Sequence, residues 1–69
     1  MDIDEVRALL RRRVDEIGGA TAYARRHAVT QVYVSDVLGG RRLPGPAILD
    51  ALGLRRVAAE ARYEEAVSE

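Results

Sequence analysis

The chain has 69 residues, of which 48% are apolar and 32% are charged. This length allows one small domain, whose core rarely supplies more than about 3–5 kcal/mol of stability. With no cysteine and one histidine, disulfides and a zinc site are excluded as additional support. We therefore expect closely packed helices, a partner subunit, or both. No apolar run reaches membrane length and the first residues are acidic, so we expect a soluble cytoplasmic protein with no membrane partner.

The net charge is zero, but the charges are unevenly distributed. Residues 25–56 carry six arginines against two aspartates, whereas residues 57–69 carry one arginine against four glutamates. All eleven basic residues are arginine, and guanidinium groups suit bidentate contacts to phosphate and guanine. A GC-rich genome explains the same bias, so it favours a nucleic-acid partner only together with other features.

The first seventeen residues predict an amphipathic helix. Asp2 and Glu5 have the spacing of a capping box, and Gly18 is a typical left-handed C-cap. The arginines at positions 11–13 are expected to form a solvated face, with a phosphate contact as the alternative. Apolar residues at helical spacing are expected on the inner face: Val6, Leu9, Leu10, Val14 and Ile17.

A second short helix is predicted over residues 20–27. Tyr23 is expected in the core with its hydroxyl at the edge. Arg25 and Arg26 point to other sides, where they either contact phosphate or are solvated. His27 has no Ser, Cys or acidic partner at a recognisable spacing, so we expect a structural or surface role and no catalysis.

The stretch 28–42 is the most informative part of the sequence. Thr30 is a good N-cap for a third helix, which we expect over residues 31–38. Its inward positions are apolar: Val34, Val37 and Leu38. Its outward positions are Gln31, Val32, Ser35 and Asp36, with Tyr33 at the border. Two short helices joined by a tight turn, with a polar N-terminal face on the second, are how a small protein reads a DNA major groove.

Residues 19–54 resemble the phage-repressor (Cro-type, lambda-repressor-like) helix-turn-helix family. The resemblance is carried by Ala24, Val29-Thr30-Gln31, the run from Tyr33 to Leu38, Gly40-Arg41-Arg42, and Pro46 to Leu54. It implies a compact four-helix, all-α domain that binds double-stranded operator DNA, usually as a homodimer.

The resemblance also implies roles for individual residues. Thr30 and Gln31 would lie at the start of the recognition helix, with Gln31 placed for a bidentate contact to adenine. Ser35 would reach a base edge or phosphate, and Val32 a thymine methyl group. Arg41 and Arg42 would bind phosphates or enter a groove. The full set of predicted DNA-binding residues is Thr21, Arg25, Thr30, Gln31, Val32, Tyr33, Ser35, Arg41 and Arg42.

Three positions differ from what the resemblance to operator-binding proteins leads us to expect. Family members often have glycine where this chain has Ala28, which implies a positive φ at the turn. They often have glutamine at the position of Ala20, and Thr21 is the candidate substitute for its phosphate contact. Asp36 could accept from a cytosine amino group, but we expect it to pair with Arg41 or Arg42 and orient them.

The C-terminal part predicts a fourth helix and an arm. Pro46 is suited to the first position of a helix that continues over residues 47–52, with Gly53 as C-cap and Leu54 folding back onto it. We place the DNA-binding domain at residues 1–54 and an arm at 55–69. The residue pattern of the arm fits either a strand or a short helix. We favour an extended arm that pairs with a dimer mate. The alternative for residues 64–69 is a disordered acidic tail.

The sequence therefore predicts a sequence-specific transcriptional regulator, of the phage-repressor type. The alternative is an antitoxin-like or other protein-interaction module on the same fold, which the zero net charge slightly favours. An enzyme finds almost no support, and no cofactor, metal or small-molecule ligand is indicated.

Overall fold

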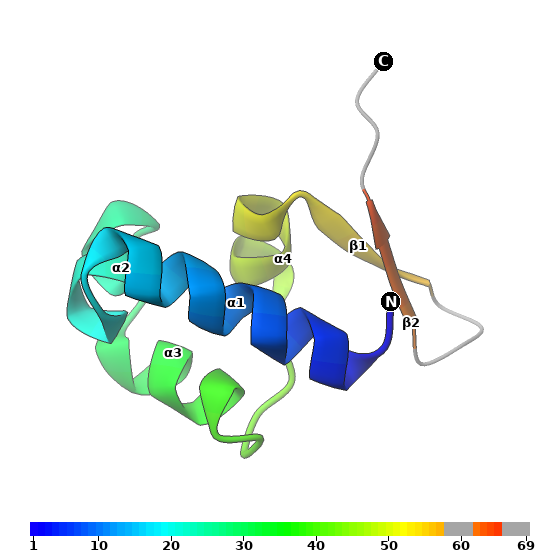
Figure 1. The fold of residues 1–69 in the computed structure, drawn as a ribbon, viewed down its shortest axis with the longest axis horizontal. Coiled ribbons are helices and arrows are strands. Elements are labelled where there is room, and N and C mark those ends of the chain that lie inside the picture. Colours follow the sequence, from blue (N-terminus) through cyan, green and yellow to red (C-terminus); the bar gives the residue numbers. More distant parts are fainter. Residues whose placement is uncertain (58–61, 66–69) are drawn as a thin grey trace.

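The computed structural model describes residues 1–57 and 62–65 of the chain. These residues form α1 (Ile3–Ile17), α2 (Ala20–Arg26), α3 (Gln31–Leu38), α4 (Pro46–Leu52), β1 (Leu54–Val57) and β2 (Arg62–Glu65). α1 crosses the molecule, α2 and α3 lie at its C-terminal half, and the two strands lie beside its N-terminal end (Figure 1). No helix within these residues is both long and apolar enough to cross a membrane.

The helices begin and end at the residues that the sequence indicates. Asp2 and Glu5 form the predicted capping box, in which Glu5 N–H donates to Asp2 Oδ1 at 2.9 Å. Gly18 ends α1 in the left-handed conformation, with φ 103°. Pro46 begins α4 and Gly53 ends it, again left-handed. The structure therefore confirms the predicted helix ends. They could be predicted because capping depends on residues close together in the sequence.

The C-terminal arm is partly strand, which agrees with the extended arm favoured from the sequence, and the all-α description holds only for residues 1–53. β1 and β2 pair antiparallel, with Arg55 opposite Glu64, and these two side chains form an ion pair. The arm was expected to pair with a dimer mate, whereas its strands pair with each other in one chain. The alternative for residues 64–69, a disordered acidic tail, does not hold for Glu64 and Glu65, which belong to β2; residues 66–69 lie outside the described residues.

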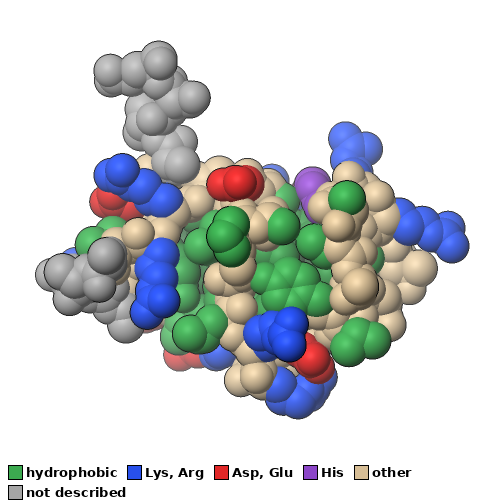
Figure 2. Space-filling model, turned by 180° about the vertical axis from the view of Figure 1, so that it is seen from behind, with side chains coloured by type: hydrophobic (Ala, Val, Ile, Leu, Met, Phe, Trp, Pro, Cys, Tyr) green, Lys and Arg blue, Asp and Glu red, His purple; other side chains and the backbone are tan. Residues whose placement is uncertain are grey.

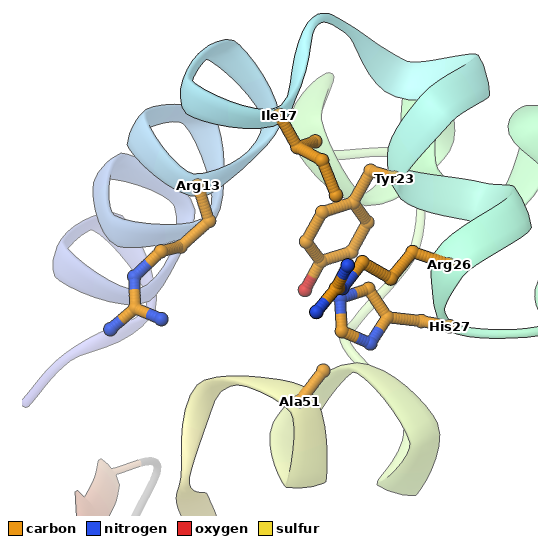
Figure 3. Close-up of a pocket in the computed structure, with 6 residues that line it drawn as sticks. All are labelled: Arg13, Ile17, Tyr23, Arg26, His27 and Ala51. Atoms are coloured by element: carbon orange, nitrogen blue, oxygen red, sulfur yellow. The ribbon is translucent and has the colours of Figure 1, made fainter.

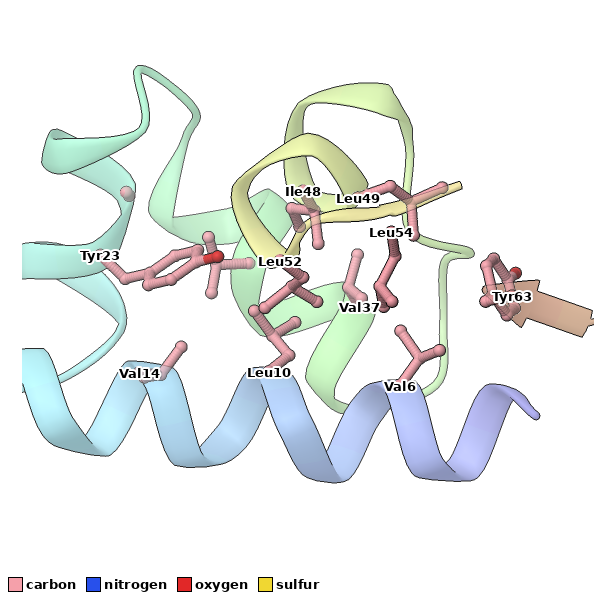
Figure 4. Close-up of a cluster of buried hydrophobic side chains, with 12 residues drawn as sticks. Val6, Leu10, Val14, Tyr23, Val37, Ile48, Leu49, Leu52, Leu54 and Tyr63 are labelled. Carbon is pink, nitrogen blue, oxygen red and sulfur yellow. The ribbon is translucent and has the colours of Figure 1, made fainter. Parts of the chain in front are cut away.

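The core runs along the inner face of α1. Figure 4 shows the α1 side chains Val6, Leu10 and Val14 directed into the cluster, with Tyr23 near one end and Tyr63 near the other. Leu9 and Ile17, also predicted inside, are only partly buried and pack against it. The other buried members are Ala24, Val34, Val37, Ile48, Leu49, Leu52 and Leu54.

The hairpin is tied to the start of the chain. Met1 and Tyr63 exchange two backbone hydrogen bonds: Tyr63 N–H donates to Met1 O at 2.7 Å, and the Met1 amino group donates to Tyr63 O at 2.9 Å. Met1 thus lies beside β2 as a further strand residue would. Because Leu54 and Tyr63 are also buried, the arm contributes to the same core as the helices.

Candidate nucleic-acid interface

The turn between α2 and α3 is tight and strained at one residue. Ala28 has φ 56°, and no other non-glycine residue in the described ranges has a positive φ. This confirms the positive φ expected at Ala28, which costs an alanine of order 1 kcal/mol. Val29 N–H donates to Ala24 O at 3.0 Å, which closes the turn over the end of α2. Only the four residues 27–30 separate the two helices.

α3 is capped and held from inside, as predicted. The Thr30 hydroxyl accepts from Tyr33 N–H at 3.1 Å, so Thr30 is the N-cap. Val34 and Val37 are fully buried in the core. An eight-residue helix with three valines has little stability of its own, so this packing fixes the direction in which its outer face points.

The outer face of α3 presents an amide and an aliphatic group. Gln31 is exposed, and its Nε2 donates to Ser35 Oγ at 2.9 Å. This bond holds the Gln31 side chain along the helix and leaves the amide oxygen and one N–H to bind elsewhere. Val32 is 64% exposed. A glutamine amide pairs with the N6 and N7 edge of adenine, and an aliphatic group suits the thymine methyl.

Asp36 pairs with Arg41, which confirms the preferred interpretation of this acidic residue. Arg41 Nε donates to Asp36 Oδ1 at 2.9 Å. The Asp36 carbonyl also accepts from the backbone N–H groups of Arg41 and Arg42, at 2.9 and 3.3 Å. The carboxylate therefore holds the Arg41 guanidinium at the C-terminal end of α3. Both side chains are partly exposed, so the pair contributes at most about 1 kcal/mol to stability.

Tyr33 links α3 to the loop before α4. Its hydroxyl accepts from Gly45 N–H, and a Cβ on residue 45 would lie 2.5 Å from that oxygen, so the contact needs glycine. The guanidinium of Arg42 lies 5.5 Å from the centre of the Tyr33 ring, within cation–π range. Tyr33 thus supports Arg42 and the loop, a role that sequence analysis missed because twelve residues separate Tyr33 from Gly45.

Seven of the nine predicted site residues form three groups, and the other two, Thr30 and Val32, lie at the start of α3. Hydrogen bonds connect the side chains of Gln31 and Ser35, and Ser35 O accepts from Arg41 Nη2 at 3.4 Å. Tyr33 and Arg42 stack. Thr21 and Arg25, four residues apart on α2, are both exposed, and no hydrogen bond or ion pair joins either to the α3 residues within the described ranges.

The surrounding surface mixes apolar and basic groups. On the face seen in Figure 2, hydrophobic side chains extend across the middle and basic side chains lie around the margin. Within the described ranges, the most exposed of the large apolar side chains are Val32 and, in the loop after α3, Leu43, which is 57% exposed. Such a surface can bind a polyanion through its arginines or a protein through its apolar part.

Comparisons with protein-family models, with curated proteins and with solved structures gave no match.

Proposed function

We propose that this protein is a sequence-specific, double-stranded DNA-binding regulator of the phage-repressor type, in which α2 and α3 act as a helix-turn-helix unit. The observation that carries the proposal is the N-terminal face of α3. There the exposed Gln31 amide is held in place by a hydrogen bond to Ser35, next to the exposed Val32. Gln31 and Val32 lie in the first turn of α3, and the opposite face of this helix is buried.

The dimensions and charges of the site support this function. An α-helix with its side chains is about 10–12 Å in diameter, so α3 fits the width of the major groove, which is about 12 Å. Arg25, Arg41 and Arg42 are exposed on α2 and just after α3. In the proposed complex these arginines bind backbone phosphates and set the register, and the residues at the start of α3 read base edges.

A homodimer is part of the proposal. One short helix reads few base pairs, and symmetric regulators place two such helices one DNA turn, about 34 Å, apart. The molecule measures 32 × 29 × 17 Å along its principal axes, so two copies side by side can present α3 at that spacing. The operator would then be a palindrome.

The test is a selection from a random-sequence duplex library, followed by binding measurements at several salt concentrations. We expect one enriched palindromic motif and affinity that falls with salt, because arginines displace counterions from phosphates. Failure to enrich any duplex, or an affinity that does not change with salt concentration, contradicts the proposal.

Arg42→Ala gives the salt experiment a residue-level readout. Loss of one phosphate contact reduces the slope of log K against log salt by about 1 per protomer, with a similar loss of affinity on all sequences. Arg12→Ala is the matched control, since Arg12 is an exposed arginine on α1. Equal slopes for wild type and Arg42→Ala would show that Arg42 does not contact a DNA phosphate.

A protein-interaction module on the same fold is the second candidate. It is favoured by the exposed Val32 and Leu43 and by the zero net charge. The same library selection separates the two functions, because an interaction module enriches no duplex.

A further inference from the structure

A pocket of about 270 Å³ lies between α1, α2 and α4. Figure 3 shows Arg13 and Ile17 reaching it from α1, Tyr23, Arg26 and His27 from α2 and its C-cap, and Ala51 from α4. Ligand sites for larger organic molecules usually measure about 300–1,000 Å³. At about 30 Å³ for each water-sized group, this pocket has room for roughly nine non-hydrogen atoms, enough for a small anion.

A buried hydroxyl without a partner points into this pocket. Tyr23 is 2% exposed, and its hydroxyl oxygen has no hydrogen-bond partner among the described residues. Its ring stacks at a tilt on His27, with 4.3 Å between the ring centres, and its hydroxyl is directed toward the space between Arg13 and Arg26 (Figure 3). A buried donor normally has an acceptor, so this hydroxyl can donate a hydrogen bond to an acceptor that occupies the pocket.

The charges around the hydroxyl select the kind of acceptor. The lining includes the basic residues Arg13 and Arg26 and also His27, and within the described ranges no acidic residue belongs to it. Burial raises the pKa of Tyr23 and the nearby Arg13 lowers it, with burial the larger effect, so the phenol stays a donor at neutral pH. Several donors around one small space suit an oxyanion, because charged acceptors make the stronger hydrogen bonds.

The pocket faces away from the proposed DNA-binding side of α2. At 100° per residue, Tyr23, Arg26 and His27 lie on the side of the helix opposite Thr21 and Arg25. A duplex held by the latter pair cannot also fill the pocket. The pocket therefore suits a free small anion and not a backbone phosphate of the same duplex.

We propose that this pocket is a binding site for a small phosphate- or carboxylate-bearing anion. Arg13 and Arg26 pair with the anion, and the Tyr23 hydroxyl donates a hydrogen bond to it. This site is independent of the proposed DNA binding, because it uses no residue of the α3 face.

The test is an NMR titration of the full chain at neutral pH without DNA. Sodium phosphate, sodium sulfate and sodium succinate are added separately at constant ionic strength, with sodium chloride as the reference. We expect saturable shifts at the amide and side-chain N–H signals of Arg13, Arg26 and His27. Saturation with phosphate and sulfate alone identifies a phosphate-type ligand, and saturation with succinate alone identifies a carboxylate.

Three variants decide whether the binding uses this pocket. Tyr23→Phe keeps the buried ring and removes only the hydroxyl, and Arg13→Ala removes one guanidinium; each should weaken binding about tenfold. Arg12→Ala, one residue from Arg13 but outside the lining, should leave binding unchanged. No saturable shift with any of the three anions, or equal weakening by Arg12→Ala, overturns the proposal.

Discussion

Ala28 carries backbone strain that glycine would relieve. Its φ of 56° lies in the left-handed region, and its side chain is exposed, so nothing there is gained from the methyl group. Ala28→Gly removes the steric cost but makes the unfolded chain more flexible. We expect a net gain of about 0.5–1 kcal/mol in the free energy of unfolding, measured by urea denaturation.

The control for Ala28 is Ala8→Gly, at an exposed position inside α1. That change should cost about 1 kcal/mol, the ordinary penalty for glycine in a helix. If both substitutions destabilise the protein equally, the strain assigned to the α2–α3 turn is wrong.

Because Tyr23 is buried, we expect the stability of the folded protein to fall at alkaline pH. Burial raises the pKa of Tyr23 above its ordinary value of 10.0. As pH rises past 10, the unfolded chain releases this proton first, so the stabilising contribution present below pH 10 falls until the folded pKa is passed. Wild type should lose stability relative to Tyr23→Phe as the pH rises above 10.0 in urea denaturation, and parallel curves for the two proteins would contradict the assignment.

At the level of elements, the hairpin is an integral part of the core. Tyr63 is 4% exposed and lies near the Val6 end of the cluster (Figure 4). Tyr63→Ala should therefore cost about 3 kcal/mol or more in the free energy of unfolding, as for other buried aromatic residues. Tyr63→Phe keeps the ring and should cost less than about 1 kcal/mol. A small effect of Tyr63→Ala would mean that the arm is separable from residues 1–54.

The helices could be predicted from the sequence because their ends are marked locally. Asp2 with Glu5, Thr30 and Pro46 each act within three or four residues of their own position. The hairpin could not be predicted with the same certainty, because the apolar residues of the arm fit both a strand and a helix. Contacts distant in sequence, such as Met1 with Tyr63, favour the strands in the folded chain.

The candidate site divides in the same way. The outward set on α3 and the pairing of Asp36 with an arginine follow from helical periodicity and short spacing. The link from Tyr33 to Gly45 and the pocket shared by Arg13 and Tyr23 join different elements. Only the packing of α1, α2 and α4 brings the pocket residues together, and no single segment of the sequence carries that pattern.

At the scale of the whole molecule, the distribution of charge matters more than its sum. The basic segment 25–56 contains the proposed reading helix, whereas the acidic residues Glu64 and Glu65 lie on β2, in a different part of the fold. Arg41 is held by Asp36, so Arg25 and Arg42 are the arginines of the site without an acidic partner among the described residues. We therefore expect modest affinity for one copy and useful affinity for a dimer, whose two copies double the phosphate contacts.

The proposed reading of DNA by α3 is tested most directly by Gln31→Ala. Fluorescence anisotropy would compare a selected duplex with a scrambled one of the same composition, for wild type, Gln31→Ala and the control Arg12→Ala. We expect Gln31→Ala to reduce the ratio of the two affinities about tenfold, since one bidentate base contact contributes about 1–3 kcal/mol of discrimination. Arg12→Ala should keep the wild-type ratio. An unchanged ratio in Gln31→Ala, or no discrimination by wild type, would contradict the claim that α3 reads the sequence.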